Sequence, residues 1–198
     1  MAFMSIHGIG KSTSWSSLRL RDRIAPGLRV LFVGINPGVR SAITGHHFAG
    51  FSNRFWKLLT ESGIVPEPIT FESDDRLPEW GLGITNLVAR PTPGINDLKP
   101  AEYAAGWKIL ERKIARYKPG TVALVGVTLY RALLPMLSGA PRRSAARLTA
   151  APESVLGRRP ETVHGAHVFV LPNPSGRNAN FSHAEMLEAF RALKSFVR

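Results

Sequence analysis

Apolar residues in this chain alternate between short continuous runs and longer segments in which they recur every three or four positions. Continuous runs are typical of strands that are buried on both faces, because neither face of such a strand needs polar residues. The runs fall at residues 28–35, 82–88, 121–127 and 167–171. The segments between them have the apolar spacing of helices with one buried face. Strands that alternate with helices predict a mostly parallel sheet covered on both faces.

Start and stop signals bound three of the predicted helices. Ser52 is expected to cap the first helix, which Gly63 ends. Pro100 opens the second, and Ser182 with Glu185 makes a capping box for the last. A further short helix is expected after the third strand.

Two segments fall outside this alternation. Residues 1–22 are polar and rich in serine, so we expect a flexible extension before a domain at 23–198. Residues 138–160 contain five arginines and little periodicity, which predicts a basic, mobile insertion that either contacts DNA or is simply exposed. GIGKST at 8–13 resembles the end of a phosphate-binding loop, but the first glycine of that loop would fall at Ser5.

Composition and charge limit the kinds of reaction and the kinds of partner that this chain can have. The 198 residues are 44% hydrophobic, which supports a sizeable core, and the absence of cysteine excludes disulfides and thiolate chemistry. No apolar run approaches the roughly 20 residues that cross a membrane, and we expect a cytoplasmic protein. Lys and Arg number 26 against 14 Asp and Glu, a net charge of +12. This excess favours a polyanionic partner such as nucleic acid, although an arginine-rich proteome would produce it too.

Two of the predicted strands end in similar motifs. VGINPG at 33–38 and LPNPSG at 171–176 each place an asparagine before a proline, with a glycine close behind. The carboxyl ends of parallel strands meet at one edge of the sheet, where ligands bind, so Asn36 and Asn173 are expected to face one site. Turns that satisfy only their own backbone would explain one such motif. Two at equivalent strand ends favour a shared site.

Four segments carry a family resemblance: LRVLFVGINPG, TGHHFAGFSNRFWKLL, GITNLVARPTPG and VLPNPSG. In this order they resemble the mismatch-specific uracil-DNA glycosylases, the bacterial relatives of thymine-DNA glycosylase, from about Ile24 to the C-terminus. The resemblance implies a three-layer α/β/α sandwich with a mostly parallel central sheet, uracil-DNA glycosylase-like. It also implies a monomeric base excision repair enzyme that uses no metal or other cofactor. Such an enzyme flips uracil from G·U mispairs in double-stranded DNA and hydrolyses the N-glycosidic bond.

The resemblance assigns roles to residues of the pocket. Asn36 matches the catalytic asparagine, which positions the attacking water. Phe48 matches the aromatic residue that stacks on the flipped base, and Ile35 is expected to contact the edge of the pyrimidine through its backbone. Asn173 stands where faster uracil glycosylases carry histidine. An amide orients water without being ionised and is a weaker base than a carboxylate, so we expect a slow enzyme.

DNA contacts are implied for four further residues: Gly38, Ser175, Gly176 and Arg177. Arg177 departs from the apolar wedge of close bacterial relatives, which leaves the dependence on an opposite guanine open. Asn86 and Arg90 are given a secondary role. His46 and His47 are expected on a mobile loop before Phe48 and are given none.

Three alternatives stay open at this point. The same fold can act mainly on another base, such as ethenocytosine, hypoxanthine, xanthine or thymine. The chain can be a nucleic-acid-binding domain without activity. It can also be a nucleotidase that uses GIGKST, which truncation of residues 1–20 would test.

Overall fold

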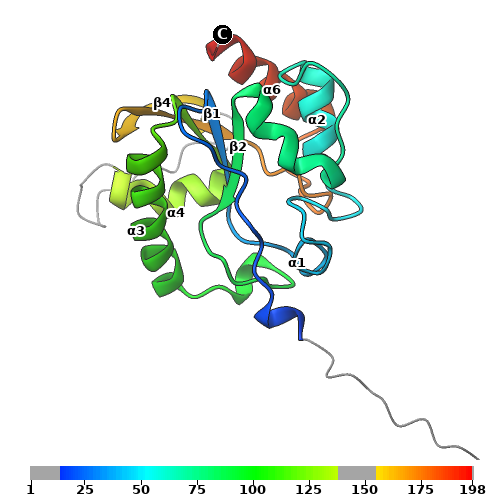
Figure 1. The fold of residues 1–198 in the computed structure, drawn as a ribbon, viewed down its shortest axis with the longest axis vertical. Coiled ribbons are helices and arrows are strands. Elements are labelled where there is room, and N and C mark those ends of the chain that lie inside the picture. Colours follow the sequence, from blue (N-terminus) through cyan, green and yellow to red (C-terminus); the bar gives the residue numbers. More distant parts are fainter. Residues whose placement is uncertain (1–13, 138–154, 198) are drawn as a thin grey trace, which may run out of the picture.

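The computed structural model of the chain describes residues 14–137 and 155–197. Five strands in this part form one sheet in the order β2-β1-β3-β5-β4 (Figure 1). The strands are β1 (Val30–Gly34), β2 (Leu82–Asn86), β3 (Thr121–Val125), β4 (Gly157–Val163) and β5 (Ala166–Leu171). All neighbouring pairs are parallel except β4 with β5. The predicted sheet is therefore confirmed.

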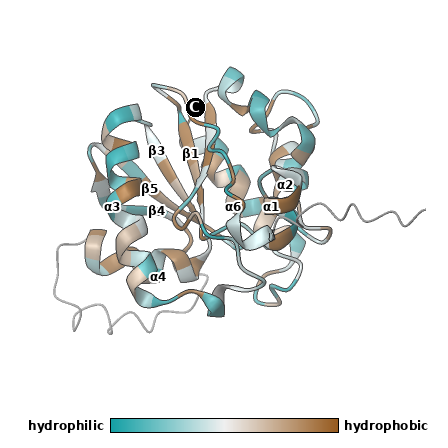
Figure 2. Ribbon diagram, turned by 60° about the horizontal axis from the view of Figure 1, so that its bottom comes forward, coloured by the Kyte–Doolittle hydropathy of each residue, from teal (hydrophilic) through white to brown (hydrophobic). Residues whose placement is uncertain are grey.

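Helices cover both faces of the sheet. The α-helices are α1 (Val39–Thr44), α2 (Phe55–Ser62), α3 (Pro100–Tyr117), α4 (Val127–Leu137) and α6 (His183–Phe196). The 3-10 helices are η1 (Trp15–Ser17), η2 (Phe71–Trp80) and η3 (Ile95–Asp97). Helices α3 and α4 pack with one face of the sheet and α2, η2 and α6 with the other, and the hydrophobic residues concentrate on the strands between them (Figure 2). The three-layer architecture agrees with the predicted fold class.

Local signals were right for some helix ends and wrong for others. Ser182 and Glu185 form the predicted capping box of α6, with both reciprocal hydrogen bonds present. The N-cap of α2 is Arg54 rather than the predicted Ser52. The reason is that Asn53 supplies the side-chain oxygen, which accepts a hydrogen bond from the backbone N–H of Phe55 at 3.0 Å.

The two segments set apart by the sequence differ in what the structure describes. Residues 1–13, which include GIGKST, and residues 138–154 lie outside the described part. Residues 157–160, predicted to belong to the basic insertion, are part of the edge strand β4. Residues 14–22 contact the domain, because Asp22 accepts a hydrogen bond from Thr85 and pairs with Lys113. The division at 22/23 stays a prediction.

Candidate active site

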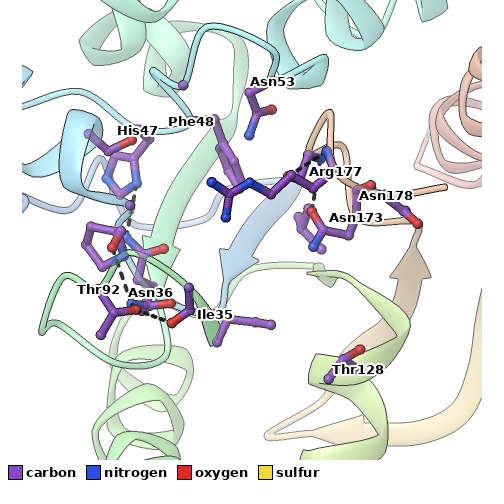
Figure 3. Close-up of a pocket in the computed structure, with 18 of the residues that line it drawn as sticks. Ile35, Asn36, His47, Phe48, Asn53, Thr92, Thr128, Asn173, Arg177 and Asn178 are labelled. Atoms are coloured by element: carbon purple, nitrogen blue, oxygen red, sulfur yellow. Dashed lines mark hydrogen bonds between the residues drawn. The ribbon is translucent and has the colours of Figure 1, made fainter. Parts of the chain in front are cut away.

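A pocket of about 560 Å³ opens at the carboxyl ends of the parallel strands, where both Asn-Pro motifs reach it (Figure 3). Most of the predicted site residues line it: Ile35, Asn36, Gly38, Phe48, Asn86, Asn173, Ser175 and Arg177. Arg90 and Gly176 are the two that do not. The structure thus brings the predicted residues together, and the role of each stays a prediction.

The amide of Asn36 is oriented by three acceptors. Its Nδ2 lies 2.7 Å from Thr92 Oγ1, 3.1 Å from the carbonyl oxygen of Arg90 and 3.3 Å from that of Pro37. Carbonyl oxygens only accept, and the Thr92 hydroxyl donates its own proton to the carbonyl of Gly94 at 2.6 Å. The nitrogen must therefore face this side. Asn36 Oδ1 has no partner among the described residues and is left for the pocket.

Asn173 is oriented the opposite way. Its Oδ1 accepts a hydrogen bond from the backbone N–H of Ser175 at 3.0 Å, which is the turn that the sequence offered as an alternative to a ligand site. Only the oxygen is used in this turn, and Nδ2 has no partner among the described residues. Asn178 fixes the turn by donating to the Asn173 carbonyl at 2.7 Å. The pocket therefore has an amide acceptor after β1 and an amide donor after β5.

Phe48 is held with one ring face covered. Its φ of +50° is left-handed, a strained conformation for an aromatic residue. Its ring stacks on Phe55 with 4.2 Å between centroids and 21° between planes. Gly34 makes room for this arrangement, because a Cβ there would lie 2.6 Å from Asn86 Oδ1 and 3.3 Å from Phe48 Cζ. The half-buried Phe48 lines the pocket.

The backbone around Phe48 is anchored on both sides by hydrogen bonds, and the mobility expected for this loop stays a prediction. Trp56 Nε1 donates to the carbonyl of His47 at 2.9 Å. Arg40 Nε donates to the carbonyl of Ala49 at 2.6 Å. Phe48 is therefore preorganised for a planar ligand.

Asp74 is a fully buried carboxylate that holds the same segment from behind. It accepts hydrogen bonds from Arg23 Nε at 2.8 Å and from the backbone N–H of His47 at 2.9 Å. His46 Nδ1 lies 3.1 Å from it. A buried charge is tolerated when it is paired and hydrogen-bonded in this way. Asp74 is thus a structural partner of the site that the sequence analysis missed.

His47 is neutral and sets the orientation of Asn86. Burial lowers the pKa of His47 from 6.5 to about 4, outweighing nearby carboxylates that raise it. Its Nε2 lies 3.0 Å from the carbonyl oxygen of Arg21, so we assign the proton to Nε2 and leave Nδ1 as an acceptor. Asn86 Nδ2 lies 3.4 Å from this Nδ1. The Oδ1 of Asn86 therefore lies on the other side, next to Gly34, where a Cβ would be 2.6 Å from this oxygen and 3.3 Å from Phe48 Cζ.

Arg54, at the start of α2, is bound to the loop after β5. Its backbone N–H donates to the carbonyl of Pro174 at 2.9 Å. Its Nη2 donates to the carbonyls of Ser175 and Asn178 at 3.2 and 3.3 Å. These contacts hold the exposed Arg177 at the mouth of the pocket.

The two predicted residues outside the pocket wall both support its loops. Gly176 approaches Ser52 so closely that a Cβ would lie 2.8 Å from the Ser52 carbonyl oxygen. Arg90 makes a two-pronged ion pair with Glu102 at 2.8 and 2.9 Å, which lowers the pKa of Glu102 to about 2. This pair fixes the segment that presents Thr92 to Asn36.

In the part of the chain that the structure describes, the pocket wall carries only positive and neutral side chains. Among the described residues none of its lining side chains is a carboxylate, and its arginines are Arg40, Arg131 and Arg177.

In residues 14–137 and 155–197 no group of three or more His, Asp or Glu side chains is placed to hold a metal ion. No helix in that part is long and apolar enough to cross a membrane. The arrangement suits an anionic ligand with a planar, hydrogen-bonding group.

Comparison with known proteins shows which family the chain belongs to. The model of the family described as "Uracil DNA glycosylase superfamily" matches residues 22–194, which is most of the chain. The fold is similar to the solution NMR structure of a candidate uracil DNA glycosylase from Methanosarcina acetivorans. The TM-score is 0.54 at 17% sequence identity, over 89% of this chain and 98% of that one. At this identity the structural likeness concerns the fold alone. The family match goes further: the chain belongs to the uracil DNA glycosylase superfamily, and its class of activity is that of a DNA glycosylase.

Proposed function

We propose that the chain is a monofunctional glycosylase that removes uracil, or a related damaged pyrimidine, from G·U mispairs in double-stranded DNA. The observation that carries the proposal is the pair of oppositely oriented amides, Asn36 and Asn173, in a pocket whose described wall has no carboxylate. One amide offers an acceptor to a water and the other offers a donor to a leaving base. This arrangement fits hydrolysis of a bond whose leaving group becomes an anion.

The reaction breaks the bond between C1′ of the sugar and N1 of uracil, and both bonding electrons leave with the base. Positive charge develops on the sugar and negative charge on uracil, which is a tolerable anion. A water that donates a proton to Asn36 Oδ1 turns a lone pair toward C1′ and adds there, after which its proton passes to solvent. Asn173 Nδ2 donates to a carbonyl oxygen of the departing base and stabilises its charge. Neither amide is ionised, so the enzyme is slow.

The flipped base is read by stacking and by one oriented acceptor. Phe48 offers a ring face that is already fixed by Phe55. Asn86 Oδ1 accepts from the N3–H of uracil, and the neutral His47 keeps this amide from turning over. Cytosine has a lone pair at N3 and would meet the oxygen unfavourably. Ile35 contributes a pocket surface, since its carbonyl is already paired with the N–H of Val88.

Duplex DNA is the proposed partner because the mouth of the pocket is basic. Arg177 is exposed there and can fill the stack that the flipped base vacates, donating to the unpaired guanine or to a phosphate. Gly38 lies exposed at the start of α1 with nothing within 4 Å of its Cβ position, which leaves room for a DNA backbone. The proposed enzyme acts as a monomer, without a metal ion, in the cytoplasm.

Base release from defined duplexes tests the proposal. Duplexes carry uracil, thymine, ethenocytosine or hypoxanthine, each opposite all four bases, and single-turnover release is measured in excess protein. We expect the fastest release from uracil opposite guanine. Faster release of another base would move the specificity within the same class of enzyme. Release of none of them would contradict the proposed activity.

A further inference from the structure

Phe51 is the most exposed large apolar side chain in the described part of the chain, at 91% of its full exposure. It lies on the segment between Phe48 and α2, and its neighbours Gly50 and Asn53 line the active-site pocket. An aromatic ring held in water at the rim of a DNA-binding pocket needs an explanation, because burying it on binding is favourable.

Arg40 holds this ring in a defined position. Its guanidinium carbon lies 3.6 Å from the centroid of the Phe51 ring. The Nε of Arg40 donates to the Ala49 carbonyl at 2.6 Å, which fixes the plane of the guanidinium. Its two Nη groups have no hydrogen-bond partner among the described residues. A free ring face and free donors for a phosphate therefore lie side by side.

A hollow of about 400 Å³ lies next to this pair and shares a wall with the active-site pocket. The shared residues are Arg40, Phe48, Gly50 and Asn53. Phe51, Trp56 and Phe71 supply apolar surface, Lys57 adds a second positive charge, and Glu72 is the carboxylate in its described wall. Aromatic rings with nearby cations are the usual surface for bases and phosphates of a nucleic-acid strand.

We propose that Phe51 and Arg40 form a stacking platform for the base next to the flipped nucleotide on the substrate strand. This inference rests on the proposed glycosylase function. Flipping removes one base from the stack and leaves a free face on each of the two neighbouring bases, and Phe51 covers one of these faces while Arg177 lies against the other. The Nη groups of Arg40 contact the phosphate that joins the two nucleotides. The platform supplies affinity for the distorted strand from outside the base pocket.

The test combines protein variants with two kinds of modified DNA: a duplex that resists cleavage, and the same duplex with one base missing beside the flipped nucleotide. The probe is a duplex with 2′-fluorinated deoxyuridine opposite guanine, which resists cleavage, and its affinity is measured by fluorescence anisotropy. Phe51→Ala is expected to bind about tenfold more weakly, in the range for loss of one base–aromatic stack. Phe51→Trp should bind like the original protein. Ile109→Ala is the matched control, since Ile109 is an exposed apolar residue on α3, away from the pocket.

A base-free spacer then replaces the 5′ or the 3′ neighbour of the flipped nucleotide. One of the two spacers should weaken binding of the unmodified protein but leave Phe51→Ala unchanged, because the stacking partner is already gone. The platform is overturned if both spacers weaken binding of Phe51→Ala as much as they weaken binding of the unmodified protein. It is also overturned if Phe51→Ala binds the probe with unchanged affinity. A change in the oligomeric state of free Phe51→Ala would also overturn it, in favour of contact between copies. Uracil release by the unmodified protein is measured separately, so a failure of the proposed function is seen independently.

Discussion

Replacing Asn36 by Asp places a titratable group where the structure has an oriented amide. The substitution keeps the size of the side chain and changes the donating NH₂ into an oxygen. An ionised carboxylate would set this oxygen against the carbonyls of Arg90 and Pro37, whereas a carboxylic acid still donates a hydrogen bond to one of them. Hydrogen bonding to the neutral form disfavours ionisation. We therefore expect the pKa of the introduced carboxyl to lie above the ordinary value of about 3.9.

The size of the shift follows from the contacts. Ionisation removes one hydrogen bond, which contributes about 1 kcal/mol. It also brings a charge to about 3 Å from two carbonyl dipoles, for which we take a cost of similar size, about 1 kcal/mol. The total of about 2 kcal/mol corresponds to about 1.5 pH units. The hydroxyl of Thr92 can recover part of this by turning from the Gly94 carbonyl to the carboxylate.

The assay is single-turnover uracil release by Asn36→Asp from a G·U duplex between about pH 4.5 and 8.5, with circular dichroism at each pH as the folding control. The rate is expected to rise through a midpoint near about pH 5.5. Above the midpoint it should match or exceed the rate of the original protein, because a carboxylate is the stronger base. A rate that stays level down to about pH 4.5, as it would if the midpoint lay at or below the ordinary value of about 3.9, would refute the orientation derived for Asn36. A variant that is folded but inactive at every pH would refute its role in water activation.

Three further predictions concern the Arg177 loop, the ion pair of Arg90 with Glu102, and the independence of the reaction from metal ions. Arg177→Ala should weaken binding to the abasic product and slow cleavage of duplexes more than of single strands; equal slowing of both, with an unchanged salt dependence, would mean that this loop does not enter DNA. Because Arg90 holds the pKa of Glu102 at about 2, their bond stabilises the protein fully above about pH 4.3, and this contribution falls as the pH drops toward 2. The loss of melting temperature in Glu102→Gln should therefore be smaller at pH 3 than at pH 6, and equal losses would contradict the assignment. Uracil release should be unchanged in excess EDTA, and activity lost in EDTA and restored by a divalent cation would overturn the metal-free reaction.

The central sheet could be predicted because its strands are buried on both faces and read as continuous apolar runs, as in β1, β3 and β5. The edge strand β4 was missed for the opposite reason. Its half-buried and exposed positions alternate up to the buried Val163, and it carries Arg158 and Arg159, so its sequence looks like a basic loop. The short helix α1 was missed too, because six residues at Val39–Thr44 give little periodicity.

Asn36 and Asn173 could be predicted to face one pocket because each follows directly after a strand end. The groups that orient them could not, because their partners are far apart in the sequence. Thr92 reaches Asn36 across 56 residues, and Arg54 reaches Ser175 across 121. Asp74 sits in η2 and has no local signal of its interaction with the His47 backbone. Such pairings are set by the packing of the sheet and its loops rather than by any local pattern.

Single-turnover uracil release by Asn36→Ala is the sharpest test of the water-holding role of Asn36. The rate is measured on a G·U duplex, and the affinity for the cleavage-resistant 2′-fluorinated duplex is measured with the same protein. We predict a loss of about 100-fold or more in rate, because the water loses its acceptor. Affinity should change by only a few-fold, since Phe48 and Arg177 remain in place. A rate equal to that of the original protein would contradict the mechanism, because the attacking water would then not depend on Asn36.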